Sequence, residues 1–319
     1  MLPKVSIAHL PTPLEPLPRL SVRLGGPNLY IKRDDLTGLA LGGNKTRKLE
    51  FLIAEAQANG ARMLITAGAT QSNHCRQTAA AAARFGFTCI LVLTGEKPPI
   101  KVGNTLLDSL MGAKIIWTSK DKRDEVLQST FDANWEKGHR PYLIPYGGSS
   151  ATGVAAYAYA LQELLIQQDS IDWLVLASSS GGTQAGLLIG AGMCGWYGKI
   201  LGISVDEPAS ILIKHVQELV SAGSSKMNLN TKLSPTSIRI NDNYLGEGYG
   251  VMGQPEKEAI QLFAKQEGII LDPVYTGRAA AGLIDLIGQG FFKKDEKVVF
   301  WHTGGTPALF ASQYTDALQ

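Results

Sequence analysis

The 319-residue chain has few cysteines, little net charge and no long apolar run. Its three cysteines, Cys75, Cys89 and Cys194, are too sparse for a disulfide framework and have no zinc-site spacing, which favours a reducing, cytoplasmic compartment. The net charge of +2, with both signs mixed along the chain, does not indicate a nucleic-acid partner. The nearest approach to a membrane span, residues 185–195, is too short and is broken by glycine, so we expect no membrane association.

A metal site and a secretory leader are not indicated either. The five histidines do not have the spacing of metal ligands, and the first residues lack the apolar segment of a signal peptide. Glycine, by contrast, is abundant: its 35 residues exceed one in ten. We therefore expect many tight turns and several places where backbone approaches backbone closely.

Short apolar strands alternate with helical patterns along the whole chain. This alternation predicts an α/β protein with parallel sheets that helices cover on both faces. More than eight such units could form a barrel or two open sheets, and their uneven spacing favours two open sheets. Strands are expected at 29–32, 63–66, 89–93, 114–117, 142–144, 173–177, 200–205, 269–271 and 298–302; helices at 45–59, 77–85, 105–111, 124–137, 153–167, 183–193, 209–220, 255–267 and 277–288; and a loop at 224–237.

The most informative stretch is Gly-Gly-Asn-Lys at residues 42–45, directly before a helical pattern. Lys45 is expected on the first turn of that helix, where the positive end of the helix dipole destabilises its ammonium group. A lysine with a lowered pKa is a candidate nucleophile toward a carbonyl carbon. The stretch also resembles a nucleotide-binding P-loop, but Asn44 replaces the glycine required before the lysine, and no strand leads directly into it.

A run of small polar residues follows the predicted strand 63–66. In Gln-Ser-Asn-His, residues 71–74, the side chains and backbone N–H groups could bind an anion at a helix start. Ser72 or Asn73 could equally be an ordinary helix cap, and taken alone these residues favour that interpretation.

The segment Ser-Ser-Ser-Gly-Gly-Thr, residues 178–183, joins an apolar strand to a helix. Hydroxyl groups, glycines and a helix N-terminus in this order favour a phosphate site over a generic glycine-rich turn. The nearby glycines of residues 190–195 match dinucleotide-binding spacing, with Asp206 after a later strand. They lie inside the predicted helix, however, so packing of small residues between helix and sheet explains them better.

Two further loops lie near the end of the chain. Residues 302–307, His-Thr-Gly-Gly-Thr-Pro, again follow a strand and precede a helical start. Residues 271–277, Leu-Asp-Pro-Val-Tyr-Thr-Gly, offer Tyr275 either as a hydrogen-bonding group of a site or as a core or interface aromatic. The segment alone does not separate these two alternatives.

Taken together and in order, these motifs resemble those of one family. Gly-Gly-Asn-Lys-x-Arg-Lys-Leu-Glu, Gln-Ser-Asn-His, the Ser/Gly/Thr loop, Leu-Asp-Pro-Val-Tyr-Thr-Gly and His-Thr-Gly-Gly-x-Pro-Ala-Leu-Phe are similar to those of the D-cysteine desulfhydrase / 1-aminocyclopropane-1-carboxylate (ACC) deaminase family. These are pyridoxal 5′-phosphate (PLP) enzymes of the tryptophan synthase β-like fold, fold type II. The resemblance extends over residues 11–311.

The resemblance implies two domains with PLP in the cleft between them. Residues 1–47 and 153–319 would form the large PLP-binding domain, and residues 48–152 the small α/β domain. It also implies a homodimer that acts on a small amino-acid substrate.

The resemblance assigns roles to the matching positions. Lys45 would bind the PLP aldehyde covalently and move the proton on the substrate Cα. Asn73 would bond the cofactor 3′-oxygen, and Ser72 would hold the substrate carboxylate or assist proton transfer. Tyr249 and Tyr275 match active-site tyrosines of the family. The phosphate-binding residues implied are Lys48, Ser180, Gly181, Gly182 and Thr183.

Two threonines favour the D-cysteine desulfhydrase branch. The ACC deaminases carry Glu at the position of Thr276 and Leu at that of Thr303, and His74 also follows the desulfhydrase pattern. A carboxylate near the pyridine nitrogen strengthens the ring as an electron sink, whereas a threonine hydroxyl leaves the nitrogen neutral. For the elimination of a thiolate, the weaker electron sink is enough. The expected reaction is therefore α,β-elimination of D-cysteine to pyruvate, hydrogen sulfide and ammonia.

Other reactions on the same scaffold stay open. They are cleavage of L-cysteate with release of sulfite, deamination of ACC, and PLP or amino-acid binding without turnover. Contacts to the leaving group are expected from residues 146–150 and 206–210. Acidic groups at Asp206 and Glu207 would disfavour a sulfonate, although the sequence does not place them in the pocket.

Overall fold

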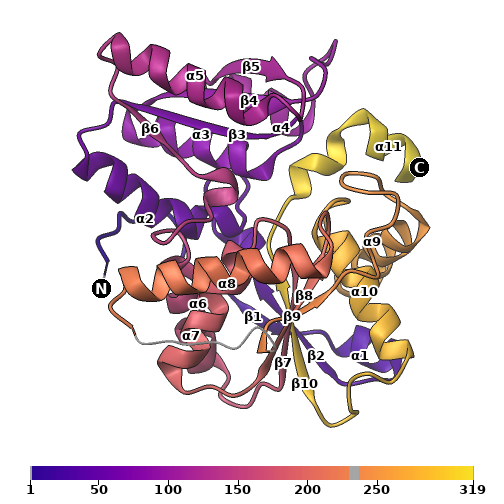
Figure 1. The fold of residues 1–319 in the computed structure, drawn as a ribbon. Coiled ribbons are helices and arrows are strands. Elements are labelled where there is room, and N and C mark those ends of the chain that lie inside the picture. Colours follow the sequence, from indigo (N-terminus) through magenta and orange to yellow (C-terminus); the bar gives the residue numbers. More distant parts are fainter. Residues whose placement is uncertain (1, 230–236, 319) are drawn as a thin grey trace.

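The computed structural model describes residues 2–229 and 237–318 and arranges them in two lobes (Figure 1). Within these residues the strands form a six-stranded sheet in the order β1-β2-β10-β7-β8-β9 and a four-stranded sheet in the order β5-β4-β3-β6. The predicted α/β class with two open sheets is confirmed. The strands are β1 Leu14–Pro16, β2 Asn28–Arg33, β3 Met63–Ala69, β4 Thr88–Thr94, β5 Lys114–Thr118, β6 Pro141–Leu143, β7 Trp173–Ser178, β8 Lys199–Ser204, β9 Arg239–Asn241 and β10 Lys297–His302.

The pairing in both sheets is parallel except at β1, which runs antiparallel to β2. The sequence did not predict β1, because Pro16 and the neighbouring prolines hide it. Proline is tolerated there because β1 is an edge strand and one side of it makes no ladder bonds. The short helix α1, Pro18–Leu24, follows directly.

Helices cover both faces of the large sheet. In β7, Leu174 and Leu176 pack with α6, α7 and α8, whereas Trp173 and Val175 pack with α1, α9 and α10. Because successive side chains point to opposite faces, a strand buried on both sides reads as one continuous apolar run. The helices are α6 Ala155–Gln167, α7 Gly182–Cys194, α8 Ala209–Lys226, α9 Gln254–Glu267 and α10 Thr276–Gly288.

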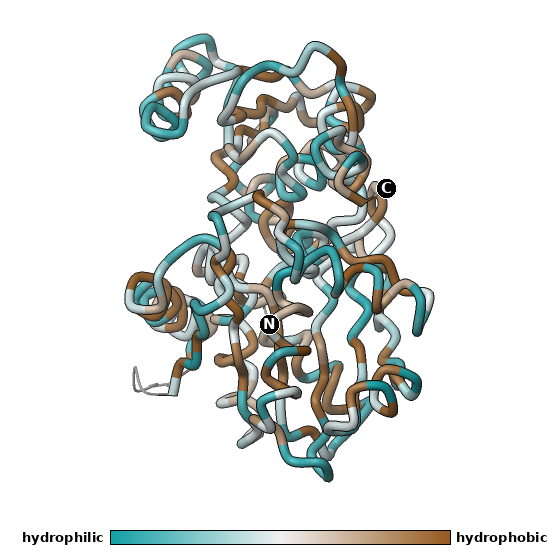
Figure 2. The backbone as a smooth tube through the Cα atoms, turned by 90° about the vertical axis from the view of Figure 1, so that its right-hand side faces the viewer, coloured by the Kyte–Doolittle hydropathy of each residue, from teal (hydrophilic) through white to brown (hydrophobic). Residues whose placement is uncertain are grey.

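The small sheet is covered in the same way. Leu64 and Leu91 face α2 and α3, whereas Ile65 and Ile90 face Leu127 and other residues of α5. Figure 2 shows the apolar strands running through the middle of each lobe. Strands β3 to β6 all lie within residues 63–143, inside the predicted small domain, whose exact boundaries stay a prediction. The helices are α2 Asn44–Ala58, α3 Asn73–Phe85, α4 Gly103–Leu110 and α5 Arg123–Glu136, and η4 Thr306–Phe310 and α11 Ser312–Leu318 end the chain.

Some local predictions were wrong. Helix α8 extends to Lys226, so residues 224–226 are not loop, and residues 230–236 lie outside the described part of the chain. Residues 269–271 are not a strand. Ile269 and Leu271 are buried, but β2 and β7 already occupy both sides of β10. Helix α3 begins at Asn73, four residues earlier than expected.

The dinucleotide-like glycines do lie inside a helix, but their packing partner is another helix. A Cβ on Gly190 would come within 2.8 Å of the Ala158 carbonyl oxygen, and one on Gly186 within 2.3 Å of the Val154 carbonyl oxygen. These glycines therefore let α7 approach the α6 segment closely, in place of the expected contact with the sheet.

Asp34, directly after β2, is fully buried and joins several distant elements. Its carboxylate accepts hydrogen bonds from Arg47 on α2 at 2.9–3.0 Å, Tyr157 on α6 at 2.5 Å, Trp301 on β10 at 2.8 Å, and the Thr12 hydroxyl at 2.9 Å. Burial alone would raise the pKa of Asp34, but the charge and hydrogen bonds of Arg47, with those of Tyr157 and Trp301, lower it below its usual value. Asp34 is therefore a buried anion whose partners fix the first turn of α2.

A second carboxylate completes this network. Glu163 on α6 pairs with Arg47 at 2.9 Å and with the buried Lys32 of β2 at 2.6 Å. The two carboxylates together offset the charges of the two buried cations.

We expect Asp34→Asn to destabilise the protein by about 3–5 kcal/mol, because it removes one partner of a buried ion pair. Urea unfolding followed by circular dichroism measures the change. Asp295→Asn is the matched control, since Asp295 is exposed and forms no hydrogen bond or ion pair with the other described residues; its effect should stay within about 0.5 kcal/mol. Equal stability of the two variants would show that the Asp34 network is not needed.

Candidate active site

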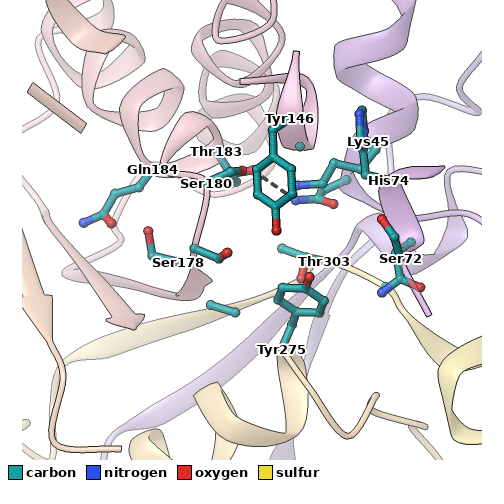
Figure 3. A pocket seen from close by; sticks show the side chains of 17 residues that line it. Lys45, Ser72, His74, Tyr146, Ser178, Ser180, Thr183, Gln184, Tyr275 and Thr303 are labelled. Atoms are coloured by element: carbon teal, nitrogen blue, oxygen red, sulfur yellow. Dashed lines mark hydrogen bonds between the residues drawn. The ribbon is translucent and has the colours of Figure 1, made fainter. Parts of the chain in front are cut away.

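A pocket lies where loops following strands of both sheets meet (Figure 3). The carboxyl ends of parallel strands share one edge of a sheet, so the loops after β7 and β10 lie together, and the loop after β3 faces them. Figure 3 shows Tyr146 and Tyr275 between the serine loop and the side that carries Lys45 and Ser72. The predicted site residues that line this inner pocket are Lys45, Ser72, Asn73, Ser180, Gly181, Thr183, Tyr275 and Thr303.

Lys45 is the second residue of α2, so its predicted place on the first turn is confirmed. The preceding Gly43 has a φ of 125°, and a Cβ there would lie 2.6 Å from Gln77 Nε2. Burial lowers the pKa of Lys45 to about 8, and the charge of Asp206 opposes this shift. From the sequence we expected the helix dipole to lower the pKa of Lys45, whereas burial is the main cause in the structure.

Lys48 lies one turn further along α2, behind the pocket lining. Its Nζ donates to the Gly147 carbonyl at 3.2 Å and to Ser149 Oγ at 3.3 Å. Burial and the nearby charge of Lys45 lower its pKa well below the usual value. Among the described residues, no carboxylate lies within ion-pair distance of its Nζ. A buried amine in this setting indicates a place for an anion.

The start of α7 faces Lys48. Its cap residue Gly181 has a φ of 70° and brings no side chain to the helix start, where the Gly182 N–H donates to Ser149 Oγ at 3.2 Å and to the Ser180 carbonyl at 2.8 Å. A Cβ on Gly182 would come within 2.4 Å of Ser149 Oγ and 2.9 Å of Lys48 Nζ. Gly182 and Lys48 therefore form the wall of the same cradle, although neither lines the open pocket.

Hydroxyl groups complete the cradle. Ser180 Oγ accepts from Ser149 Oγ at 2.8 Å, and Thr183 Oγ1 accepts from Asn44 Nδ2 at 3.0 Å. Ser178 Oγ is buried at the pocket wall and has no partner within the described part of the chain. Free hydroxyls, a helix N-terminus and a buried amine suit a phosphate group.

Ser72 and Asn73 begin α3 on the opposite side of the pocket. Ser72 Oγ accepts from Cys75 N at 3.1 Å, which confirms the capping interpretation, and its hydroxyl is within hydrogen-bonding reach of the Cys75 thiol. Asn73 Oδ1 accepts from Asn104 Nδ2 at 2.9 Å, so its own Nδ2 is left as a donor. Asn104 on α4 was not predicted, because only tertiary structure brings it beside Asn73.

Tyr275 and Tyr249 share one hydrogen bond. Their hydroxyl oxygens are 2.5 Å apart, and burial raises the pKa of both phenols well above 10. Both tyrosines are therefore neutral near pH 7. Tyr275 lines the inner pocket, whereas Tyr249 lines a neighbouring cavity, called the outer cavity below.

The two threonines used in the sequence argument lie in different settings. Thr303 lines the inner pocket. Thr276 is fully buried outside the lining, where its hydroxyl donates to Asp272 Oδ1 and accepts from Asp272 N, both at 2.7 Å. Thr276 begins α10, and Asp272 also accepts its backbone N–H at 2.7 Å. The structure therefore places the Thr276 hydroxyl in a helix cap and not in the pocket.

The turn Tyr146–Gly148, labelled η2 in the sequence of elements, forms an unexpected part of the site. Gly147 has a φ of 63°, and a Cβ there would lie 2.3 Å from Ser180 Oγ and 3.5 Å from Lys45 Nζ. Tyr146 covers the pocket, and the Arg123 guanidinium lies 4.9 Å from the centre of its ring. In the sequence this turn is visible as Tyr-Gly-Gly after an apolar strand. We expected these residues to contact the leaving group only. Further lining residues that lie outside the predicted motifs are Ala177 and Gln184.

Residues 2–229 and 237–318 contain no helix that is long and apolar enough to cross a membrane. In the same residues, no group of three or more His, Cys, Asp or Glu side chains is placed to hold a metal ion.

The family model for pyridoxal-phosphate dependent enzymes matches residues 5–304. The chain belongs to this family. Its fold is that of the fold type II PLP enzymes, and PLP is its cofactor. The site fits this cofactor, because it combines a lysine of lowered pKa with a phosphate cradle whose buried amine has no carboxylate partner.

The chain is similar to known proteins over almost its whole length. It is 42% identical to D-cysteine desulfhydrase of Klebsiella pneumoniae (strain 342), covering 97% of this chain and 96% of the relative, and 43% identical with the same coverage to D-cysteine desulfhydrase of Salmonella typhi. Among solved structures, an ACC deaminase homologue is 36% identical, with a TM-score of 0.92 over 99% of this chain and 95% of the other.

We expect Gly147→Ala to weaken PLP binding about tenfold or more, because the added methyl group overlaps Ser180 Oγ at the phosphate cradle. Titration of the cofactor-free protein with PLP, followed by absorbance, measures the dissociation constant. Gly138→Ala is the matched control, since Gly138 has a φ of 72° but nothing within 4 Å of its Cβ position. If the two variants bind PLP equally weakly, the strain of the left-handed backbone that they share limits binding, and the overlap with Ser180 does not.

The lowered pKa of Lys45 predicts how covalent capture of PLP depends on pH. The neutral amine is the nucleophile, so the rate should rise as pH increases through about 8, instead of near the usual lysine value of 10.5. The measurement is the initial rate of capture from about pH 6 to pH 10, fixed with borohydride and mapped by mass spectrometry. A tag on another lysine, or a midpoint near 10, would contradict the assignment.

Proposed function

We propose that this protein is a D-cysteine desulfhydrase, which converts D-cysteine to pyruvate, hydrogen sulfide and ammonia and is therefore a carbon–sulfur lyase. The observation that carries the proposal is 42–43% identity over nearly the full length to relatives of that name. The pocket supports it, because Lys45, Ser72 and Tyr275 surround one space beside the phosphate cradle.

Lys45 is the group that moves the Cα proton. When bound, PLP supplies an electron sink for the charge left on Cα. A pKa of about 8 leaves part of the Lys45 amine neutral near pH 7, so it can act as a base, and its protonated form can return the proton. The phosphate cradle holds the cofactor in place while Lys45 performs these transfers.

The opposite wall orients the substrate. The Ser72 hydroxyl lines the pocket and would turn from the Cys75 thiol to donate to the substrate carboxylate, since the helix cap uses only an oxygen lone pair. The Asn73 amide is held by Asn104, which leaves its Nδ2 as the donor that would hold the 3′-oxygen of the cofactor. The neutral Tyr275 hydroxyl, supported by Tyr249, can donate a hydrogen bond to the departing sulfur.

ACC deaminase activity is the second candidate, favoured by the likeness to the solved ACC deaminase homologue. We rank it lower because Thr303 and Thr276 stand where that branch carries Leu and Glu, and opening a cyclopropane ring needs the stronger electron sink.

We also propose that the enzyme acts in the cytoplasm as a homodimer. All three cysteines are free thiols, two of them buried, which suits a reducing compartment. Leu106 and Leu110 on α4 are 44% and 73% exposed, and such side chains on one helix face suit a subunit contact. Sedimentation equilibrium measures the assembly.

We expect the protein with PLP to release sulfide and pyruvate from D-cysteine in equal amounts. Lys45→Ala should lower the turnover number by at least about 10³-fold, because it removes the proton-transfer group. Lys101→Ala, at an exposed lysine, is the matched control and should retain full activity.

A substrate panel decides between the candidates. It contains D-cysteine, L-cysteine, β-chloro-D-alanine and ACC, each assayed for keto acid and ammonia. Formation of 2-oxobutanoate from ACC without sulfide from D-cysteine would favour ACC deaminase. Spectral changes without any product would indicate a binding protein.

A further inference from the structure

The outer cavity continues from the inner pocket toward solvent. Tyr146, Ser179 and Ser180 line both spaces, so the two are neighbours across these side chains. The outer cavity has a volume of about 500 Å³, enough for part of a small ligand. If the phosphate cradle and Lys45 hold the cofactor, a substrate side chain that leaves the inner pocket on this side enters the outer cavity.

Asp206 lines the outer cavity close to its boundary with the inner pocket. It follows β8, and its Oδ2 accepts a hydrogen bond at 2.5 Å from Ser179 Oγ, a residue that lines both spaces. Its Oδ1 is buried and has no hydrogen-bond partner within the described residues. Burial lowers the pKa of Lys45, and the charge of Asp206 opposes this shift. Asp206 therefore places a carboxylate on the wall of the outer cavity, and its charge acts on the reacting lysine.

The cations of the outer cavity do not cancel this negative charge at the lysine. Arg123 is bonded to Asp124 at 2.8 Å and lies over the Tyr146 ring, so its charge is already paired. Burial raises the pKa of Asp206 and the charge of Glu207 adds to this shift, whereas the Ser179 hydrogen bond and the charge of Lys120 oppose it. Of the charged groups lining the cavity, Asp206 alone affects the pKa of Lys45.

We propose that Asp206 is a specificity-determining residue that rejects amino acids with an anionic group on Cβ and accepts a neutral thiol. A sulfonate or carboxylate placed there would meet a like charge, whereas a neutral thiol meets no such repulsion. The inference rests on the proposed function, because it identifies the class of side chain that the same site admits.

Asp206→Asn tests the proposal. The amide has the same shape, and its oxygen can still accept from Ser179, so the variant removes charge with little change in packing. The measurement is kcat/KM for sulfide release from D-cysteine and for sulfite release from both enantiomers of cysteate. The ratio of cysteate to D-cysteine values should rise about tenfold or more in the variant. Asp206→Ser, a second variant, should shift the ratio in the same direction.

Glu207→Gln is the matched control. Glu207 is also acidic and lines the outer cavity, but its hydrogen bonds are made by its backbone to Ser204 and not to the serine loop. Its ratio should change less than about twofold. A similar increase in both variants would mean that general electrostatics of the cavity, and not Asp206, sets the preference, and would overturn the proposal.

A binding measurement separates this inference from the proposed function. Absorbance titration of the PLP-loaded protein with alanine and with cysteate gives the ratio of apparent dissociation constants without any turnover. If the wild-type protein releases no sulfide from D-cysteine, the proposed function fails, and this ratio still decides the role of Asp206. An unchanged ratio in stably folded Asp206→Asn, or equal wild-type affinity for both ligands, would overturn the inference.

Discussion

The buried carboxylate of Asp34 fixes the first turn of α2, and the site depends on this constraint. Its side chain holds Arg47 on α2, Tyr157 on α6 and Trp301 on β10, and its backbone oxygen accepts the Gly43 N–H at 3.0 Å. Lys45 lies between these two anchors in the chain. The lysine therefore enters the pocket from backbone that is bound on both sides, and breaking a buried pair of this kind is costly.

Electrostatics makes the same helix a site for an anion. Lys45 and Lys48 are three residues apart on one face; burial disfavours the charge of both, and the charge of Lys45 further disfavours that of Lys48. Their free carboxylate neighbour in the site is Asp206, which acts on Lys45 and not on Lys48. A phosphate bound at the start of α7 would supply the negative partner that Lys48 lacks, while Lys45 stays available for chemistry.

Residues in local motifs could be predicted, whereas residues that act through tertiary contacts could not. Lys45, Ser72 and the phosphate loop were found because each lies at a strand–loop–helix junction that one stretch of sequence encodes. Asp34 and Asn104 carry no such signal, since their importance arises from partners far away in the chain. Thr276 shows the reverse error. Its position in a motif suggested a cofactor contact, but its hydroxyl donates to the neighbouring Asp272 carboxylate at the start of α10.

The turn at Tyr146–Gly148 is also one of two connections between the lobes, because β6 of the small sheet precedes it and α6 beside the large sheet follows it; the other leads from β2 to α2. A segment that joins the lobes is thus at the same time a wall of the pocket. Any rotation of one lobe against the other would displace the Tyr146 ring relative to Ser180. A change in the angle between the lobes therefore also changes the shape of the pocket, and neither can change without the other.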